Sequence, residues 1–438
     1  MLIISIAQKR WLAASGEDMK RHLIGIGGVG MSALATALVR LGDEVTGADR
    51  TLGTPNVRFL ESLGVRVYPD DGSGVDASTD EVIVSTAIEE TNAGLRKARE
   101  LGIPVTHRAK ALARTLGGYR LVAVVGTCGK STVTAMLGHV LAECGLDPMC
   151  VNGANVPGWE GAVRFGKGQY AVAEVDESDK SLVAFRPYAA IVTNASADHY
   201  SKEEMDEVFD AFVKDCEGPV VDGRGEVERL NVEKLKGCVP IPGAHNLQNA
   251  ALAVLMAKKL GVAEDAAIEA MRSFKGVERR LQLIRSNPST FQPFNSSTFQ
   301  PVVYDDYAHN PEKLKAMWTT LAEKHPEGIC VIWRPHGYAP LRKMMDALAA
   351  MFAETVRACD KLLLLPVYDA GGTTDRSVNS DKLKAKVEGE VEQRIELVSD
   401  LDAAYAWCAA HKGDYAAFVT CGARDPGLPG LAKRLSEM

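Results

Sequence analysis

The chain has 438 residues and a formal net charge of −7, and 46% of its residues are hydrophobic and 24% are charged. This composition is typical of a globular protein of two to four domains, and the acidic balance excludes a broad basic surface for nucleic acid or an anionic membrane. Nine scattered cysteines, the lack of any run of about 18 apolar residues and an N-terminus without a basic start favour a cytoplasmic protein without disulfides, membrane span or signal peptide.

Apolar runs without polar alternation alternate with amphipathic helical stretches along the chain. Such runs are typical of strands buried in a parallel sheet. They occupy His22–Gly25, Glu44–Ala48, Val65–Tyr68, Val82–Ser85 and Leu121–Val125. Strands that alternate with helices predict βαβ units and an α/β fold. The pattern starts again at Leu121 and at Val302, and we interpret both restarts as the openings of new domains.

A first glycine-rich loop, Gly25–Gly30, follows the first strand and leads into a helix predicted over Met31–Leu41. Glycines allow a tight turn, and a helix N-terminus offers N–H groups to a diphosphate. Asp49 ends the second strand, where a ribose-binding acid belongs in a dinucleotide fold. On its own the loop fits an NAD dehydrogenase, and the alternative is a tight turn that binds nothing. It predicts a diphosphate ligand without indicating which.

A second loop, Gly126–Thr132, connects the strand Leu121–Val125 to a helix predicted over Val133–Cys144. It departs from the usual P-loop because Val124 stands at the position of the first glycine, but the Gly-Lys-Ser core is intact. Lys130 would neutralise the β- and γ-phosphates of a nucleotide triphosphate and Ser131 would hold Mg²⁺. Two phosphate loops argue against a simple dehydrogenase. They favour one domain for ATP and another for a diphosphate-linked substrate.

An ordered set of short motifs gives the chain a specific resemblance. No single motif is decisive, but together and in this order they resemble the Mur ligases. The motifs are Gly25–Met31, Ser85–Ile88, His107–Ala109, Gly126–Thr132, Ala173–Ser178, Thr193–Asn194 with Asp198–His199, Gly243–Asn249, Gly276–Arg280, Asp305–His309 and Pro335–His336.

The resemblance implies a three-domain α/β protein. Residues 19–118 would form an N-terminal Rossmann-like domain for the UDP-linked substrate, and residues 119–278 a central P-loop ATPase-like domain with a parallel sheet. Residues 279–438 would form a C-terminal Rossmann-like ligase domain. Residues 1–18 would be an N-terminal extension outside this fold, because the family pattern begins shortly before His22 and Met19 is a natural start.

The resemblance also implies a reaction. The carboxylate of UDP-N-acetylmuramate attacks the γ-phosphate of ATP and forms an acyl phosphate, which the amine of an amino acid then attacks. In the branch of the family whose motifs match best, the amino acid is L-alanine and the product is a peptidoglycan precursor. ATP and Mg²⁺, with two metal ions, are the expected cofactors. No nucleic acid or membrane partner is expected, and the sequence does not indicate an oligomeric state.

Three residues are the catalytic candidates by this resemblance: Lys130, Glu174 and His199. Glu174 lies at the end of a predicted strand, Tyr170–Val175, and resembles the magnesium carboxylate of the family. His199 resembles the ligand of a second metal that holds the substrate carboxylate against the γ-phosphate. The metal ligands would therefore be Ser131, Glu174 and His199. The alternatives are a solvated loop charge for Glu174 and an ordinary polar surface residue for His199.

The remaining site candidates fall into two groups. The candidate ATP-binding residues are Gly126, Thr127, Gly129, Lys130, Ser131, Thr132, His245, Asn246, Asn249, Arg280, Asp306 and Tyr307. Among them, the asparagines could instead cap a helix, Asp306 resembles a ribose-binding acid, and Arg279 or Arg280 would reach the phosphates. The candidate substrate-binding residues are Gly27, Gly28, Gly30, Asp49, Ser85, His107, Arg108, His309, Arg334, His336 and Arg342. For His107 and Arg108, a turn-stabilising role is the alternative.

The chain departs from the family on the acceptor side. Alanine-adding ligases resemble one another in having an arginine after the histidine of the Pro335–His336 motif and another shortly afterwards, but here Gly337 and Pro340 stand there. Arginine grips a carboxylate in a bidentate manner, so either Arg334 and Arg342 replace the missing residues or the acceptor differs. The loop Tyr368–Arg376, with glycines 371 and 372, could line the same pocket.

Two further departures concern length and repetition. Residues 200–242 form a shorter segment than the family usually carries in its central domain. In the family this segment builds extra strands beside the active site, so the substrate side of the site is expected to differ here. Between Arg285 and Pro301 the motif Ser-Thr-Phe-Gln-Pro occurs twice, and its composition predicts a loop.

Other functions compete with L-alanine addition. The same chemistry could serve another acceptor, such as the murein tripeptide used in recycling or a different amino acid. An inactive or regulatory nucleotide-binding relative is disfavoured because Lys130, Ser131, Glu174 and His199 are all present. A Rossmann dehydrogenase does not explain the second phosphate loop.

Overall fold

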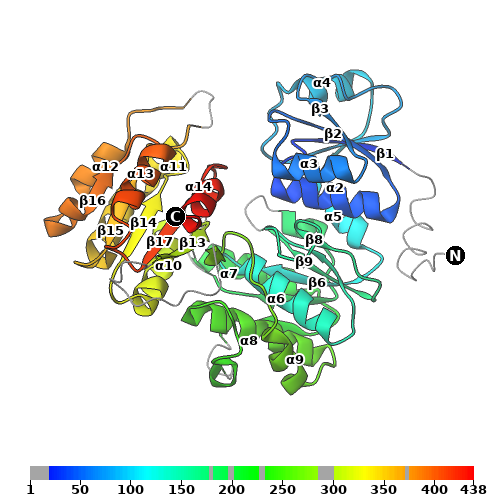
Figure 1. The fold of residues 1–438 in the computed structure, drawn as a ribbon. Coiled ribbons are helices and arrows are strands. Elements are labelled where there is room, and N and C mark those ends of the chain that lie inside the picture. Colours follow the sequence, from blue (N-terminus) through cyan, green and yellow to red (C-terminus); the bar gives the residue numbers. More distant parts are fainter. Residues whose placement is uncertain (1–18, 177–180, 196–201, 226–231, 285–299, 370–373) are drawn as a thin grey trace. The chain divides into compact units, whose positions relative to one another are not determined.

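The computed structural model describes residues 19–176, 181–195, 202–225, 232–284, 300–369 and 374–438. The chain divides into two compact units, of which the first comprises residues 1–240 and 246–277 and the second comprises residues 241–245 and 278–438. Three sheets, each flanked by helices, confirm the predicted three-part α/β fold (Figure 1). The domain limits at 118/119 and 278/279 stay predictions. The predicted extension, His199, glycines 371 and 372 and nearly all of the repeated Ser-Thr-Phe-Gln-Pro segment lie outside the described residues.

The first sheet is entirely parallel and has the strand order β3-β2-β1-β4-β5. Its strands are β1 (Lys20–Ile24), β2 (Glu44–Asp49), β3 (Arg66–Pro69), β4 (Glu81–Val84) and β5 (Val105–His107). Its helices are α2 (Val29–Leu41), α3 (Pro55–Ser62), α4 (Ala93–Glu100) and α5 (Arg108–Leu116). The strand order reverses between β1 and β4, and ligands of open α/β sheets bind at the carboxyl ends of the strands at such a point.

Apolar residues cover both faces of this sheet. On one face, α4 contributes Leu95 and Ala98 to a small core. On the other face, α2 and α5 belong to a larger core that also contains residues of the second sheet, such as Val125 and Ala173. The helices α2, α3 and α5 lie on the opposite side of the sheet from α4 (Figure 1). The first two sheets therefore share a core within the first unit.

The second sheet has the order β11-β10-β6-β9-β7-β8 and is parallel except for β8. Its strands are β6 (Arg120–Val125), β7 (Met149–Val151), β8 (Val163–Arg164), β9 (Tyr170–Glu174), β10 (Ala189–Val192) and β11 (Val220–Asp222). The helices of this part are α6 (Lys130–Glu143), η1 (Ser181–Ala184), α7 (Lys202–Lys214), η3 (Val232–Leu235), α8 (Ala244–Lys259) and α9 (Glu264–Met271). The described part of the short segment 200–242 thus adds α7, the edge strand β11 and η3.

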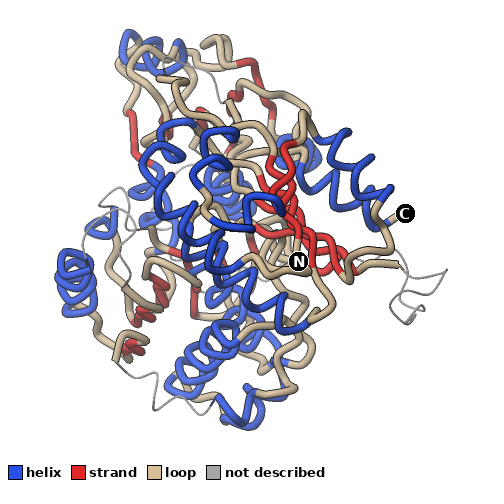
Figure 2. Tube along the Cα trace, turned by 90° about the vertical axis from the view of Figure 1, so that its left-hand side faces the viewer, coloured by secondary structure: helices blue, strands red, loops and turns tan. Residues whose placement is uncertain are grey.

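The third sheet has the order β12-β13-β17-β14-β15-β16 and is parallel except for β12. Its strands are β12 (Gln282–Ile284), β13 (Val302–Asp306), β14 (Ile329–Trp333), β15 (Lys361–Leu364), β16 (Ile395–Leu397) and β17 (Ala417–Cys421). Its helices are α10 (Pro311–Lys324), α11 (Tyr338–Thr355), α12 (Ser380–Lys386), η4 (Gly389–Arg394), α13 (Leu401–Ala410) and α14 (Leu428–Ser436). Two separate apolar cores line its faces, and helices lie on both sides of the strands (Figure 2).

The last strand of the chain, β17, is inserted between β13 and β14. Cys421 at its end is in register with Asp306 at the end of β13 and with Trp333 at the end of β14. The segments that follow these three strands therefore begin side by side at one edge of the sheet.

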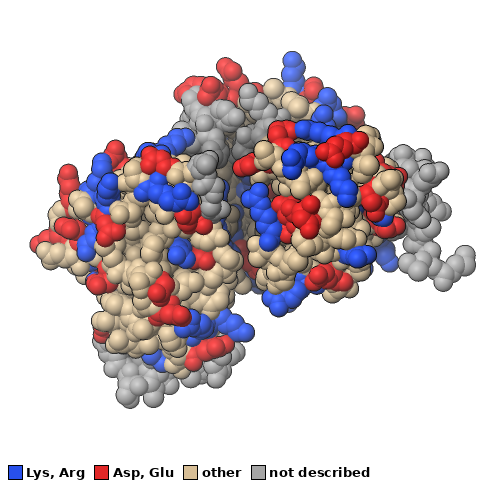
Figure 3. All heavy atoms as spheres, turned by 90° about the horizontal axis from the view of Figure 1, so that it is seen from above, with Lys and Arg blue, Asp and Glu red and all other residues tan. Residues whose placement is uncertain are grey.

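Acidic and basic side chains are interspersed on the face shown in Figure 3, without a large patch of one sign. This distribution is in keeping with the modest net charge of −7. Within the described part of the chain, the helices are all too short or too polar to cross a membrane.

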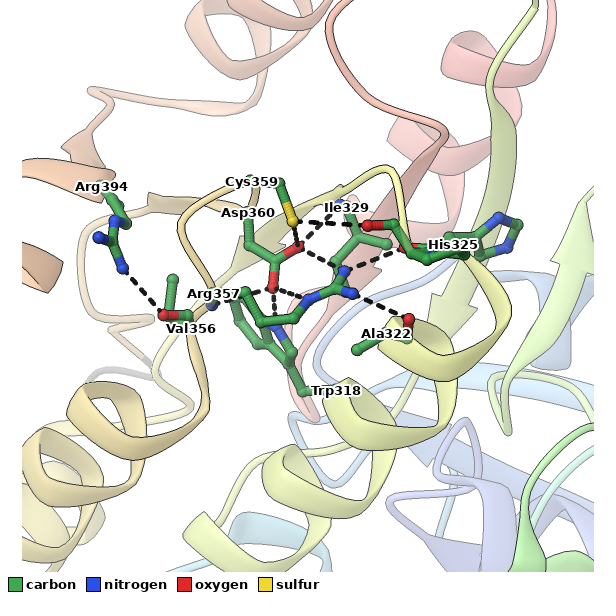
Figure 4. A network of polar contacts seen from close by, with 10 residues as sticks. Trp318, Ala322, His325, Ile329, Val356, Arg357, Cys359, Asp360 and Arg394 are labelled. Carbon is green, nitrogen blue, oxygen red and sulfur yellow. Dashed lines mark hydrogen bonds and ion pairs between the residues drawn. The ribbon is translucent and has the colours of Figure 1, made fainter. Parts of the chain in front are cut away.

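A buried carboxylate organises one end of the third sheet (Figure 4). Asp360 accepts hydrogen bonds from Nε1 of Trp318 on α10 at 2.8 Å and from the backbone N–H of Ile329 at the start of β14 at 3.0 Å. The guanidinium of Arg357 donates to the same carboxylate at 2.8 and 2.9 Å, and it also donates to the carbonyl of Ala322. Burial raises the pKa of Asp360, but the hydrogen bonds from Arg357 and Trp318 outweigh it and hold the pKa below its ordinary value.

We expect Asp360→Ala to lower the free energy of unfolding by about 3 kcal/mol, because it leaves the Arg357 charge and the Trp318 N–H without their shared partner. Asp346→Ala is the matched control, since the Asp346 side chain is 86% exposed. Urea unfolding at neutral pH measures both variants. The contribution of Asp360 is fully present above the ordinary aspartate pKa of about 4 and is lost as the pH falls, so the two proteins should converge in acid. Equal midpoints at neutral pH would contradict this role.

Candidate active site

The first glycine loop begins directly after β1 and is held by two side chains. Gly25 has a left-handed φ of 77°. The N–H of Gly27 donates to Oδ2 of Asp49 at 2.8 Å, and Nδ2 of Asn56 donates to the carbonyl of Gly27 at 2.9 Å. The other oxygen of Asp49 accepts from the N–H of Thr51 at 2.9 Å. Asp49 thus shapes the loop, and its predicted contact with substrate stays a proposal.

The carboxyl ends of β1 and β4 meet at this loop. A Cβ on Gly25 would lie 3.4 Å from Cδ1 of Ile88, in the segment that starts with Ser85. A Cβ on Gly30, at the start of α2, would lie 3.3 Å from the guanidinium of Arg108. The fold therefore brings the predicted Gly27–Gly30 segment and Arg108 together, with a cation next to free helix amides that suit a diphosphate.

His107 has a local structural role. It is the N-cap of α5, and its Nδ1 accepts a hydrogen bond from the N–H of Ala109 at 3.3 Å. This is the turn-stabilising alternative considered for it from the sequence. A substrate contact of His107 stays a proposal.

The phosphate loop between β6 and α6 depends on two glycines. Gly126 and Gly129 have φ values of 128° and 85°, which other residues rarely adopt. A Cβ on Gly126 would lie 2.1 Å from Oγ1 of Thr193, and one on Gly129 would lie 2.6 Å from Oδ1 of Asn249. Neighbouring side chains thus occupy the space that any larger residue needs. The helix begins at Lys130, three residues before the predicted Val133.

Asn194, which follows β10, clamps this loop from the side. Its Oδ1 accepts from Oγ1 of Thr127 at 2.7 Å and from the N–H of Cys128 at 2.9 Å, while its Nδ2 donates to the carbonyl of Cys128 at 3.0 Å. Thr193 donates to the same carbonyl at 2.6 Å. The sequence pointed to Thr193 and Asn194 only as a motif, and their role as loop supports appears in the structure.

Three charged or polar candidates lie in the loop or at the end of the strand next to β6. Nζ of Lys130 donates to the carbonyl of Gly126 at 2.7 Å, which keeps the ammonium over the loop. Ser131 is buried in the first turn of α6. Glu174 ends β9, where it is in register with Val124 of β6, and its Oε2 accepts from the N–H of Gly153 at 2.8 Å.

These residues fit a nucleotide triphosphate with Mg²⁺. The N-cap Gly129 has no side chain to cap α6 and the first turn of the helix contains no acidic residue, so its N–H groups are available to phosphate oxygens. Within the described ranges, no three His, Cys, Asp or Glu side chains are grouped to hold a metal. Mg²⁺ does not require such a cage, because phosphates and waters supply most of its ligands. His199 lies outside the described residues, so its predicted role is not tested.

The asparagines predicted for ATP are buried on α8. Nδ2 of Asn249 donates to Oδ1 of Asn246 at 3.3 Å, and Asn249 also faces Gly129 of the phosphate loop. In the second unit, burial lowers the pKa of His245, whose ring lies against Gly243. Their contacts with a nucleotide stay proposals.

Asp306, at the end of β13, holds the turn that precedes β12. Its two oxygens accept from the N–H groups of Leu281 and Ala308, each at 2.7 Å. Arg279 and Leu281 in that turn have left-handed φ values of 59° and 46°, an unfavourable conformation that these hydrogen bonds offset. Burial raises the pKa of Asp306, and it raises the pKa of the adjacent Asp305 to about 6 in spite of the ion pair with Arg279.

Aromatic rings gather at the same edge of the sheet. The ring centroid of His309 lies 4.8 Å from that of His336 and 5.5 Å from that of Tyr307. Cζ of Arg280 lies 5.1 Å from the ring centroid of Tyr307. Burial, together with the charge of Lys313, lowers the pKa of His309 to about 4, so its ring is neutral at neutral pH. Its Nδ1 lies 3.0 Å from the carbonyl of Tyr307 and therefore carries the hydrogen.

The two arginines expected to replace the missing family arginines are engaged elsewhere. Arg334 donates to Asp425 at 2.5 Å and to the carbonyl of Pro366 at 3.0 Å. Arg342, on α11, pairs with Asp375 at 2.8 Å and also donates to the carbonyl of that residue. Their proposed binding of an acceptor carboxylate would compete with these interactions.

Two family models match the chain. The model described as "Mur ligase family, catalytic domain" matches residues 20–120, and the model described as "Mur ligase, glutamate ligase domain" matches residues 291–424.

Curated proteins and solved structures are similar over most of the chain. It is 34% identical to a UDP-N-acetylmuramate–L-alanine ligase of Arthrobacter sp. (strain FB24), with 84% of this chain and 85% of that protein covered. Its fold is similar to that of the UDP-N-acetylmuramate-alanine ligase of Thermotoga maritima, with a TM-score of 0.77, 24% identity and coverage of 96% and 98%. The murein peptide ligase of Psychrobacter arcticus 273-4 has a TM-score of 0.63, 19% identity and coverage of 96% and 99%.

The clamp on the phosphate loop can be tested. We expect Asn194→Ala to lower kcat/KM for ATP about 10- to 100-fold, because it removes three hydrogen bonds worth about 1 kcal/mol each. Steady-state ATP turnover in the presence of the other substrates measures the effect. Asn379→Ala, which removes the asparagine cap of α12, is the matched control and should leave ATP kinetics unchanged. An unaltered kcat/KM in Asn194→Ala would show that the loop does not depend on this side chain.

Proposed function

We propose that this chain, which belongs to the Mur ligase family, is an ATP-dependent ligase that joins the carboxylate of UDP-N-acetylmuramate to the amine of an amino acid, with L-alanine as the first candidate. The 34% identical relative reported above supports this substrate pair, because it is named as an L-alanine ligase. The product is a peptidoglycan precursor, and the reaction takes place in the cytoplasm.

The phosphate loop is the observation that carries the proposal. Its backbone is held by hydrogen bonds from Thr193 and Asn194, and Asn249 packs against Gly129, so the protein itself fixes the shape of the loop. Phosphoryl transfer depends mainly on positioning and on neutralising charge, and a preorganised loop with Lys130 at its end supplies both.

Each catalytic candidate has a place in this chemistry. Lys130 neutralises the transferred phosphoryl group while the substrate carboxylate attacks it and forms the acyl phosphate. Ser131 and Glu174 would hold Mg²⁺, which would supply further charge for the phosphates. His199 would hold a second metal ion. The amine of the acceptor then attacks the acyl carbon, and phosphate leaves.

The other candidates are proposed to bind substrates. The first glycine loop, Asp49, Ser85, His107 and Arg108 bind the UDP part of the muramate substrate. Asn246 and Asn249 contact the nucleotide, as do His245, Arg280, Asp306 and Tyr307 of the second unit. His309, Arg334, His336 and Arg342 are the acceptor-side candidates.

A second candidate function differs only in the acceptor. Gly337 and Pro340 have no charged side chains at the two positions where the alanine-adding relatives are expected to carry arginine, so a different acceptor is the alternative. The murein tripeptide is the first alternative, and a different amino acid is the second. The chemistry on the ATP side is the same in all three cases.

We expect Lys130→Ala to lower turnover by a factor of order 10³ or more, since it removes the cation that faces the transferred phosphoryl group. Phosphate release with all substrates present measures the loss, and circular dichroism checks that the fold is intact. Lys236→Ala, which removes a 59% exposed lysine side chain of the same unit, is the control. ATP turnover within tenfold of wild type in Lys130→Ala would exclude the phosphate-loop assignment.

The acceptor is identified by a panel of amino acids and the murein tripeptide, each supplied with ATP and UDP-N-acetylmuramate. We expect phosphate release to require all three substrates and to be most efficient with L-alanine. UDP-N-acetylglucosamine, which lacks the reacting carboxylate, is the matched negative control. The highest kcat/KM with the tripeptide would favour the second candidate, and no release with any acceptor would refute the ligase proposal.

A further inference from the structure

The third sheet places a further arginine beside the position of a missing family arginine. Arg424 lies in the segment that follows β17, which is the strand inserted between β13 and β14. Its Nη1 lies 3.9 Å from the place that a Cβ on Gly337 would occupy. Cδ of Pro340 lies 3.5 Å from the same place. Arg424 therefore borders Gly337 and Pro340, the two positions at which the family resemblance implies arginine in alanine-adding ligases.

Arg424 differs from the other two arginines in what it contacts. Arg334 and Arg342 are paired with Asp425 and Asp375. In contrast, no hydrogen bond or ion pair joins Arg424 to any other residue in the described ranges, and the residue is exposed. The carboxylate next to it in the sequence, Asp425, is occupied by Arg334 and by the N–H of Gly427. The positive charge of Arg424 is thus available to a ligand.

Gly337 leaves the space that this guanidinium needs. Its φ of 156° and ψ of 160° lie in a region that residues with a Cβ rarely adopt, and it is buried directly after His336. An arginine side chain at position 337 would start from the place that Nη1 of Arg424 approaches. The guanidinium of Arg424 reaches this place from the segment that follows β17.

We propose that Arg424 binds the α-carboxylate of the acceptor, in place of an arginine at the start of α11. This assignment rests on the proposed ligase function and names the residue that sets its preference for a carboxylate-bearing acceptor. A guanidinium and a carboxylate form two parallel hydrogen bonds, which gives both affinity and orientation to the attacking amine.

The test compares the best acceptor of the panel with its α-amide, which keeps the amine but lacks the carboxylate charge. We expect the wild-type enzyme to prefer the acid by about 10- to 100-fold in kcat/KM, because charge-assisted hydrogen bonds to the carboxylate contribute binding free energy of that size. In Arg424→Ala this preference should fall to nearly one, through a higher KM for the acid, while the KM values for ATP and UDP-N-acetylmuramate stay within about twofold. Added guanidinium ion should partly restore activity toward the acid but not toward the amide.

Three further variants make the test specific. Arg434→Ala removes another arginine of the second unit, one that pairs with Asp402 on the surface, and should keep the full preference. Arg334→Ala and Arg342→Ala examine the two alternatives. If either of them abolished the preference while Arg424→Ala kept it, the assignment of Arg424 would be overturned. An active wild-type enzyme that did not distinguish acid from amide would overturn it as well, whereas no turnover with any acceptor would overturn the ligase function itself.

Discussion

The phosphate loop depends on a steric constraint more than on any single attractive contact. At Gly126, Gly129 and Gly153, the place of a Cβ lies 2.1 to 2.6 Å from a side-chain oxygen of Thr193, Asn249 or Glu174. The three partners come from three different elements, which meet only because β6 lies between β9 and β10 in the sheet. The lack of side chains at Gly126 and Gly129 thus lets polar groups from elsewhere in the chain close around the loop, and the lack of one at Gly153 makes room for Glu174.

Several carboxylates that resemble ligand-binding residues hold backbone in place. Asp49 accepts from Gly27 and Thr51, and Asp306 accepts from Leu281 and Ala308. In each case both oxygens bind N–H groups of turns that contain unusual φ values or close approaches. Carboxylates in this arrangement still have lone pairs for a ribose hydroxyl, so structural and ligand roles are compatible. Their first contribution is to keep the binding loops ordered.

On the proposed acceptor side, three arginines of the third sheet differ in what they contact. Arg334 is drawn toward Asp425 and Arg342 toward Asp375, which leaves Arg424 beside Gly337. Arg424 follows β17, and β17 lies next to β14 in the sheet, so the segments after these two strands lie close together.

The sequence by itself determined the three-part α/β fold and the position of both glycine-containing loops between a strand and a helix. Those features are local: buried strands appear as apolar runs, and a Gly-Lys-Ser core between a strand and a helix needs only neighbouring residues to be recognised. The limits of the elements were close, with β9 ending at Glu174 and α2 beginning at Val29 instead of Met31. The tertiary structure alone decided which polar groups meet. Three contacts join segments that are far apart in the chain: Asn194 with Cys128, Arg334 with Asp425, and Arg424 with Gly337. The order of the strands sets which carboxyl ends are neighbours, and no local sequence pattern encodes that order.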